Sequence, residues 1–457
     1  MKKAIVSSNT INSNSGILKP NFHLNYGKKR IGAAQKNGCP FLPLGEVTKK
    51  VFTGGIFKRI FISNPEYGIP YISAQHMMNL NPLDVSKIIS KKYTPRQEDM
   101  TLRHNQILLS CAGTVGNVRL IGNELDGIIG SQDIIRIIAD NSKMLYGYLF
   151  AYLSTPTAYN YIQSYIYGSV VPRIEPNTIS KLPVPIISRE KQVKIHELIK
   201  EASHLRTEAN NTFSKLINEI NTLLEIEIER KNIKYSFRKI RDIKMFEKRL
   251  DASYNCGPGR RIYDVISKQD HITLKDISEI FHPMLFGKKQ LKGSENGNFL
   301  FKSSSMMKMK PETDFVLSLR KVDLYSKLQV KEGWSLISRT GTVGNVVRIN
   351  KTLADIYIDD HMIRVKPNEN YSGLIFIYLK SFYGQKLIEF QKYGSVQEVI
   401  NSDYIERIPI PKFLLEEKLI MRFNKEVKEA SSKIDKAALN EFNSNELIEK
   451  EIESWQK

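Results

Sequence analysis

The stretch LSCAGTVGNVRLIG at Leu109–Gly122 returns later in the chain as ISRTGTVGNVVRIN at Ile337–Asn350. Gly113 and Gly341 occupy the same place in the two stretches, 228 residues apart. Three further pairs of blocks follow in the same order: DIIRI (133–137) with HMIRV (361–365), GSV (168–170) with GSV (394–396), and KLPVP (181–185) with RIPIP (407–411). Repetition of this order at a nearly constant offset predicts two copies of one folding unit.

Each copy is followed by a 45-residue stretch, 188–232 and 413–457, without glycine or proline. Apolar residues recur there every three or four positions, from Ile195 to Leu223 in the first stretch and from Ile420 to Trp455 in the second. This spacing predicts two helices with apolar seams, each up to roughly 65 Å long at 1.5 Å per residue. We expect the seams to pack against each other, with the helices antiparallel.

Within each copy the pattern is mixed and rich in strands. Short β-branched runs such as Val115–Ile121 and Ile134–Ile138 are bounded by Gly, Asn or Asp, and 144–164 and 373–390 look helical. We therefore predict an α+β fold, with two β-rich modules in tandem joined by two long antiparallel helices. The expected boundaries are 1–20 for a loose tail, 21–187 for the first module, 188–232 for its helix, 233–412 for the second module and 413–457 for the last helix.

The chain has 457 residues and a formal net charge of +20, and this charge is unevenly distributed. Residues 1–187 contain 21 Lys and Arg against 10 Asp and Glu, and residues 233–412 contain 31 against 20, whereas the two helical stretches are close to neutral. Because the basic surplus lies in the modules, the expected partner is nucleic acid and not a membrane surface. Three scattered cysteines and no long apolar run indicate a reduced, cytoplasmic protein without a zinc site.

Three patterns could suggest catalysis. GTVGN lacks the lysine of a phosphate-binding loop and lies between strands, so we interpret it as a hairpin turn. Asn64–Tyr67 (NPEY) is one residue from the NPPY signature of amino-methyltransferases, but no glycine-rich methyl-donor loop precedes it. Glu416 and Lys418 loosely fit a nuclease metal motif, and the first copy lacks that spacing. We therefore predict no catalytic residue and no bound metal.

The candidate DNA contacts lie in loops that differ between the copies while the surrounding frame agrees. Thr53–Arg59 corresponds to Phe286–Gln290, and Ile72–Met78 to Lys302–Met307. Lys and Arg in such loops contact phosphates or guanine, and Gln, His and Ser contact base edges. The expected contacts are Lys58, Arg59, Gln75 and His76 for one half of the DNA target and Lys288, Lys289, Ser304 and Arg339 for the other.

From about Phe22 to its end, the chain resembles the specificity (S) subunit of a type I DNA restriction–modification system. The resemblance rests on the paired GTVGN blocks, on Tyr167–Ile186 and Tyr393–Pro411, and on long helices that open with REKQ or EEKL. RLDASY (249–254), which leads into the second copy, also matches, whereas the first copy has HLNY (23–26) at that place.

This resemblance implies a non-catalytic DNA reader with two target-recognition domains, each for half of a split sequence in double-stranded DNA. It also implies that two methyltransferase (M) subunits dock on the helices and that restriction (R) subunits join them. S-adenosylmethionine, ATP and Mg²⁺ would then be bound by the partner subunits and not by this chain. A specificity subunit of a related two-subunit enzyme remains an alternative, as does, more remotely, an adenine methyltransferase in its own right.

Overall fold

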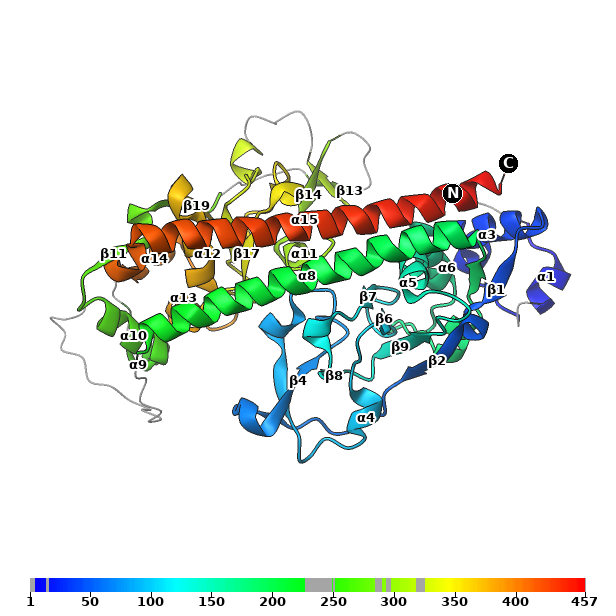
Figure 1. Cartoon of the computed structure of the whole chain (residues 1–457), viewed down its shortest axis with the longest axis horizontal. Coiled ribbons are helices and arrows are strands. Elements are labelled where there is room, and N and C mark those ends of the chain that lie inside the picture. The colour runs from blue at the N-terminus through cyan, green and yellow to red at the C-terminus, as the bar shows by residue number, and fades with distance from the viewer. Residues whose placement is uncertain are drawn as a thin grey trace. The chain divides into compact units, whose positions relative to one another are not determined.

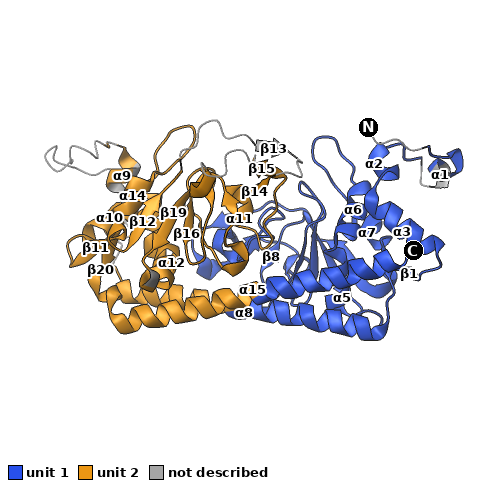
Figure 2. Cartoon of the chain, turned by 90° about the horizontal axis from the view of Figure 1, so that it is seen from above, with its two compact units in different colours: residues 1–208, 436–457 blue, residues 209–435 orange. Residues whose placement is uncertain are grey.

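The structure is a computed structural model that describes residues 5–13, 16–226, 249, 251–283, 290–292, 297–317 and 325–456. The fold is α+β and divides into two compact units (Figure 2). Unit 1 comprises Met1–Glu208 and Lys436–Lys457, and unit 2 comprises Ala209–Asp435. Each unit therefore contains one module, the first half of the helix that follows it and the last half of the other long helix.

Unit 1 has two four-stranded sheets and a two-stranded one, in the orders β2-β9-β6-β7, β3-β5-β4-β8 and β1-β10. All pairings are antiparallel except β4 with β8. The strands are β1 (Phe41–Pro43), β2 (Thr48–Thr53), β3 (Phe61–Ile62), β4 (Gly68–Ile72), β5 (Lys87–Ser90), β6 (Ile107–Ser110), β7 (Val118–Leu120), β8 (Ile129–Gly130), β9 (Ile134–Ala139) and β10 (Pro183–Pro185). The helices are α1 (Ser8–Ser13), α2 (Pro20–His23), α3 (Tyr26–Lys36), α4 (Gln97–Met100), α5 (Tyr146–Leu153), α6 (Pro156–Ser164), α7 (Pro176–Ser180) and the start of α8 (Arg189–Leu224).

Unit 2 repeats this topology, with sheets β12-β19-β16-β17, β13-β15-β14-β18 and β11-β20. Its strands are β11 (His271–Thr273), β12 (Ser278–Phe281), β13 (Gln290–Lys292), β14 (Asn298–Phe301), β15 (Phe315–Leu317), β16 (Ser335–Ser338), β17 (Val346–Arg348), β18 (Tyr357–Ile358), β19 (Met362–Pro367) and β20 (Pro409–Pro411). Its helices are α9 (Ala252–Cys256), α10 (Pro258–Ile266), α11 (Ser303–Met306), α12 (Ser372–Lys380), α13 (Phe382–Glu389), α14 (Ser402–Glu406) and the start of α15 (Glu417–Ser454). The equal strand orders confirm the predicted repeat.

The GTVGN blocks are hairpin turns, as predicted. They connect β6 to β7 and β16 to β17, and both glycines of each block have positive φ, for example 74° at Gly113 and 75° at Gly341. The Ser110 N–H donates to the Asn117 carbonyl at 2.9 Å, and Ser338 donates to Asn345 at the same distance. These turns belong to the scaffold and do not form a phosphate-binding loop.

Two expected helices are each broken into two. In unit 1, α5 ends at Leu153 and α6 begins at Pro156, because Thr155 caps α6 by accepting the Ala158 N–H. In unit 2, Ser381 has extended backbone and caps α13 by accepting the Gly384 N–H. The helical character predicted for 144–164 and 373–390 is confirmed, and each stretch is divided because a serine or threonine cap competes with helix continuation.

Helices α8 and α15 are the two long helices predicted from the apolar spacing (Figure 1). In unit 1, the start of α8 lies against the end of α15, with Lys191 2.6 Å from Glu451 and Arg206 2.9 Å from Glu441. In unit 2, Arg422 near the start of α15 pairs with Glu219 near the end of α8. Within each unit, therefore, the helices run antiparallel.

The helix boundaries and the seam differ in detail from the expectation. Helix α15 begins at Glu417, after a short 3-10 turn over Lys412–Leu415. Helix α8 ends at Leu224, and residues 227–232 lie outside the described part of the chain. Leu223 was expected in the seam but is 43% exposed, because the neighbouring Leu224 is buried instead.

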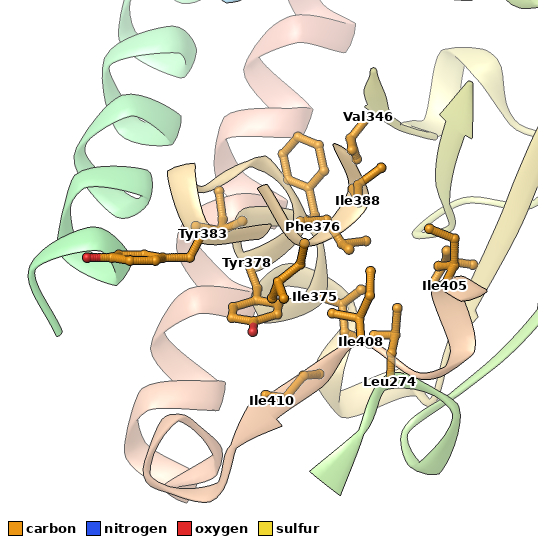
Figure 3. Packing of buried hydrophobic residues seen from close by; sticks show 14 of the residues in the cluster. Leu274, Val346, Ile375, Phe376, Tyr378, Tyr383, Ile388, Ile405, Ile408 and Ile410 are labelled. Atoms are coloured by element: carbon orange, nitrogen blue, oxygen red, sulfur yellow. The ribbon is translucent and has the colours of Figure 1, made fainter. Parts of the chain in front are cut away.

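A hydrophobic core joins the sheets and short helices of each unit to its parts of the long helices. In unit 2, α12 is buried on all sides and meets apolar residues of the sheets and of α14 (Figure 3). Leu216 and Ile220 of α8 join this core with Phe423 and Val427 of α15. In unit 1, Ile448 and Ile452 of α15 join the equivalent core around α5. The long helices are thus part of each unit's core.

The start of the first module has a counterpart of the RLDASY segment that its sequence hides. In unit 2, the Arg249 guanidinium donates to the carbonyls of Gln391, at 2.8 Å, and of Lys392. In unit 1, the Lys19 ammonium donates to the carbonyl of Ile166, which is the repeat equivalent of Lys392, at 3.1 Å. Residue 19 was expected in a loose tail, and it takes part in the fold.

Candidate nucleic-acid interface

Unit 1 carries a cluster of basic and aromatic side chains on the four-stranded sheet β3-β5-β4-β8. Tyr71 of β4 lies opposite Lys87 of β5, and Phe61 of β3 lies on the same face, one diagonal away. The rings of Phe61 and Tyr71 meet edge to face with centroids 5.6 Å apart. The Lys87 ammonium lies 5.2 Å from the Phe61 centroid. Because these contacts come from strand pairing, the sheet fixes the positions of the side chains.

Two of the predicted contact residues lie in this basic–aromatic cluster. Arg59 donates from its guanidinium to the Tyr71 hydroxyl at 3.1 Å and lies 5.9 Å from that ring. His76 follows β4, and its Nδ1 is 3.2 Å from the Ser73 hydroxyl. Burial, and then the positive charge of Lys87, lower the pKa of His76 below its usual value, so the ring is neutral at pH 7 and can both donate and accept.

Lys58 and Gln75 are exposed on the two loops that supply Arg59 and His76. The structure therefore brings the loops after β2 and after β4 to one surface, as the hypothesis of a contact region requires. Phe61, Tyr71 and Lys87 were missed from the sequence. The interleaving of basic and aromatic residues in FKRIF (57–61) was the available signal.

Unit 2 has a basic–aromatic pair at the corresponding place. Leu300 of β14 occupies the position of Tyr71, since both pair in parallel with the short strand β18 or β8. The Lys302 ammonium lies 3.7 Å from the centroid of Phe315 on β15. Ser304, a predicted contact, is exposed on α11 two residues after Lys302. Lys302 and Phe315 were missed from the sequence.

Of the other predicted residues of unit 2, only Arg339 belongs to the described part of the chain. Lys288 and Lys289 lie outside the described residues. Arg339 lies at the end of β16, where its N–H donates to the His361 carbonyl at 2.8 Å. Asp359 connects this region to the start of α11, because it accepts the N–H groups of His361 and Ser303. The described residues thus bring the predicted residues of unit 1 close together, whereas Arg339 and Ser304 of unit 2 lie on different elements.

The arrangement is suited to a polyanion. Lysine and arginine beside aromatic rings can contact phosphates, while neutral His, Gln and Ser can form hydrogen bonds to base edges. The frame of the sheets is the same in the two units, but Arg59, Tyr71, Lys87 and His76 have no identical counterparts in unit 2. Equal frames with different side chains at these positions are expected of two modules that bind different sequences.

The NPEY segment is a turn. The Asn64 side chain accepts the Glu66 N–H at 3.1 Å and caps a 3-10 turn over Pro65–Tyr67. The Asn64 amide oxygen thus has a structural role as a turn cap. Among the residues that the structure describes, no cluster of three or more His, Cys, Asp or Glu could hold a metal ion. None of the described helices has the length and apolar character of a membrane span.

Comparisons with known proteins agree with this architecture. The family model described as "Type I restriction modification DNA specificity domain" matches residues 40–222 and again residues 267–450. A comparison with curated proteins gave no match.

Solved structures of low similarity also cover nearly the whole chain. The S subunit of a type I restriction–modification system from M. genitalium is 16% identical, with a TM-score of 0.32, and 92% of this chain and 96% of that chain are covered. The HsdS subunit from Thermoanaerobacter tengcongensis is 15% identical, with a TM-score of 0.29 and coverage of 90% and 96%. A chain from a structural study of complex assembly and conformational transition of the type I R-M system is 14% identical, with a TM-score of 0.29 and coverage of 92% and 97%.

The family model matches well over half of the chain, in two blocks that coincide with the repeat found in the sequence and in the sheet orders. The chain therefore belongs to the family of type I restriction–modification DNA specificity domains and carries two copies of that domain.

Proposed function

We propose that this chain reads a bipartite sequence in double-stranded DNA, one half with each unit, and positions methyltransferase and restriction subunits on it. The observation that carries the proposal is the pair of basic–aromatic surfaces, which stand at the same place in two equal frames but differ in their residues. The net charge of +20 supports binding to a polyanion. Subunits of this family are not catalytic, so the chemistry belongs to the partners.

The proposed parts follow from this division. Residues 21–187 and 233–412 are the two target-recognition domains, and the stretches 188–232 and 413–457 form the spacer. Lys58, Arg59, Gln75 and His76 serve one half-site, and Lys288, Lys289, Ser304 and Arg339 serve the other, with Lys87 and Lys302 as additional contacts. Two M subunits, R subunits and DNA are the partners, and the complex acts in the cytoplasm. S-adenosylmethionine, ATP and Mg²⁺ are bound by those partners.

A domain exchange tests the proposal. Residues 20–187 are replaced by the equivalent segment of a related subunit, and the chimera is expressed with its methyltransferase subunit. Sequencing of methylated adenines should show one new half-site, one unchanged half-site and an unchanged gap between them. A change in both halves would contradict the assignment of one half-site to each unit.

A second experiment separates the proposal from an enzyme that acts alone. The purified chain is incubated with labelled S-adenosylmethionine and DNA, with and without the methyltransferase subunit. We expect methyl transfer only in the complete mixture, because Asn64 is engaged in its turn. Transfer by the isolated chain would favour the methyltransferase alternative.

A further inference from the structure

Each unit presents a short hairpin with the same apex, Gly-Ser-Val, at 168–170 and 394–396; we call these the Gly-Ser-Val tips. Tyr167 pairs with Arg173 at the base of the first hairpin, and Tyr393 with Val399 at the base of the second. The glycines have φ of +88° and +100°, and an added Cβ would collide with the carbonyl oxygen across the hairpin. Only glycine fits this tight apex without strain.

Both tips are fixed by backbone contacts to the neighbouring GTVGN turns. The Gly113 N–H, from the first GTVGN turn, donates to the Pro172 carbonyl at 3.0 Å, and Ala112 pairs with Arg173. In unit 2, Thr340 beside the second turn pairs with Val399. The Tyr393 hydroxyl donates to the Asn401 side chain at 2.7 Å, and the Tyr167 hydroxyl donates to Glu175 in the same way.

The side chain at each apex is apolar and fully in solvent. Val170 is 91% exposed and Val396 is 101% exposed. These valines contribute nothing to the core of either unit, and a rigid support saves the entropy that a flexible loop would lose on binding. Rigid, exposed apolar side chains at the same place in both units indicate a contact with something outside the chain.

The charges beside the tips favour a protein partner over DNA. Arg173 lies 3.9 Å from Asp133, and Glu175 lies at the base of the same hairpin. Lys392 lies 3.5 Å from Glu398 in the second hairpin. Arg173 of the first tip and Lys392 of the second therefore each lie beside a carboxylate. A phosphate backbone gains little from basic groups that are already paired, whereas an apolar pocket accepts a valine.

We infer that the Gly-Ser-Val tips are docking points, in addition to the long helices, for two identical protein subunits, one on each unit, which receive Val170 and Val396 in an apolar pocket. This inference rests on the proposed function, in which two methyltransferase subunits bind one specificity chain. The two tips have the same sequence because they bind the same partner. The basic–aromatic surfaces differ because the two DNA half-sites differ.

The test measures assembly of the full chain with its methyltransferase subunit by native mass spectrometry and by titration. The variants are Val170→Asp, Val396→Asp and the double variant, each with a Val→Thr counterpart that keeps the size. Each single Asp variant should bind one of the two methyltransferase subunits about tenfold more weakly. The double variant should bind both subunits about tenfold more weakly. The Thr variants should show smaller losses, since only the apolar methyl is replaced.

Ile56→Asp is the matched control, because Ile56 is an equally exposed aliphatic residue, at 91%, in the loop before Arg59. It should leave assembly unchanged. Unaltered uptake of both subunits by the double variant would overturn the inference alone. So would a double variant that loses DNA affinity in the absence of the methyltransferase, since the tips would then be DNA contacts. Failure of the unmodified chain to bind any methyltransferase subunit would instead overturn the proposed function.

Discussion

Arg136 in unit 1 and Arg364 in unit 2 are completely buried and donate to the same four carbonyl positions, each shifted by 228 residues. The Arg136 acceptors are Ser131, Ile134, Met100 and Gly130, and the Arg364 acceptors are Asp359, Met362, Leu328 and Ile358. These bonds connect the sheet that contains β9 or β19 to the sheet that contains β8 or β18 within each unit. Burial lowers the pKa of each guanidinium to about 10, so both remain charged at neutral pH.

Replacement of Arg364 by Met should strongly destabilise the chain. The variant removes the guanidinium bonds to four carbonyls in a buried site, and a loss of this kind costs about 3–5 kcal/mol in free energy of unfolding. Lys366→Met is the matched control on the same strand, because Lys366 is exposed and pairs with the exposed Glu279. Denaturation by urea measures both variants. Equal midpoints for the two would show that the buried bonds are not needed.

A second relationship between the units predicts a compensated pair. In unit 1, the Thr207 hydroxyl of α8 donates to Glu124. In unit 2, the position of Glu124 is occupied by Thr352 and the position of Thr207 by Asp435 of α15. Asp435 accepts from the N–H and the hydroxyl of Thr352. The same bond is therefore made with the carboxylate on the module in one unit and on the helix in the other.

Glu124→Thr or Thr207→Asp alone should destabilise unit 1, the first by loss of the acceptor and the second by bringing two carboxylates together. The double variant Glu124→Thr/Thr207→Asp recreates the arrangement of unit 2 and should recover most of the loss, with a coupling energy of about 1–3 kcal/mol. Thermal unfolding of the four chains completes the cycle. Additive losses would mean that the two residues do not interact.

The pH dependence of stability should involve His196. The Gly147 N–H donates to Nδ1 of His196 at 3.2 Å, and the ring packs edge to face on Tyr146. Burial lowers the pKa of His196 below its usual value, although Glu197 opposes the shift. The folded chain thus binds fewer protons here than the unfolded chain, so stability is retained above about pH 6.5 and falls as the pH drops below it.

Unit 2 supplies the matched variant, because Asn424 accepts the equivalent Gly373 N–H at 2.5 Å and does not titrate. His196→Asn should keep the hydrogen bond and lose less stability between pH 7.5 and pH 5.5 than the natural chain. Some dependence should remain, since burial also lowers the pKa values of His76 and His282. Melting temperatures at the two pH values check this. An identical fall in both chains would exclude His196 as a contributor.

The repeat and the helices could be predicted because they depend on local patterns. GTVGN forms a turn at both places where it occurs in this chain. Apolar residues at helical spacing predict the seam of a helix even when the element that packs against it is not known. The break at Thr155 was not predictable from apolar spacing, since a side-chain cap decides it. Leu223 and Leu224 show a similar limit, because both fit the pattern and packing selected one.

The candidate site was predictable only in part. Arg59 and His76 could be chosen because the loops that carry them differ between the copies. Tyr71 and Lys87 were missed because their neighbourhood depends on the register between β4 and β5, which the intervening turns set. Arg339 was grouped with Ser304 from sequence alone, and the fold places it at the end of another strand.

The last prediction separates the two half-sites. Arg59→Ala and Lys87→Ala should weaken binding of the methyltransferase complex to DNA, and Lys302→Ala should do so independently. A contact to a base should cost about 1–3 kcal/mol and only for its own half-site, whereas a phosphate contact should weaken all sequences and reduce the salt dependence. Tyr71→Phe removes the acceptor of Arg59 without altering charge and should give a smaller loss in the same half-site.

Lys181→Ala provides the control for charge, because Lys181 is exposed between α7 and β10, away from the cluster, and its loss lowers the net charge equally. Binding is measured at several salt concentrations with DNA altered in one half-site at a time. If Arg59→Ala and Lys302→Ala changed the preference in the same half-site, the two units could not be independent readers. If Lys181→Ala weakened binding as much as Lys87→Ala, net charge and not the basic–aromatic cluster would account for the affinity.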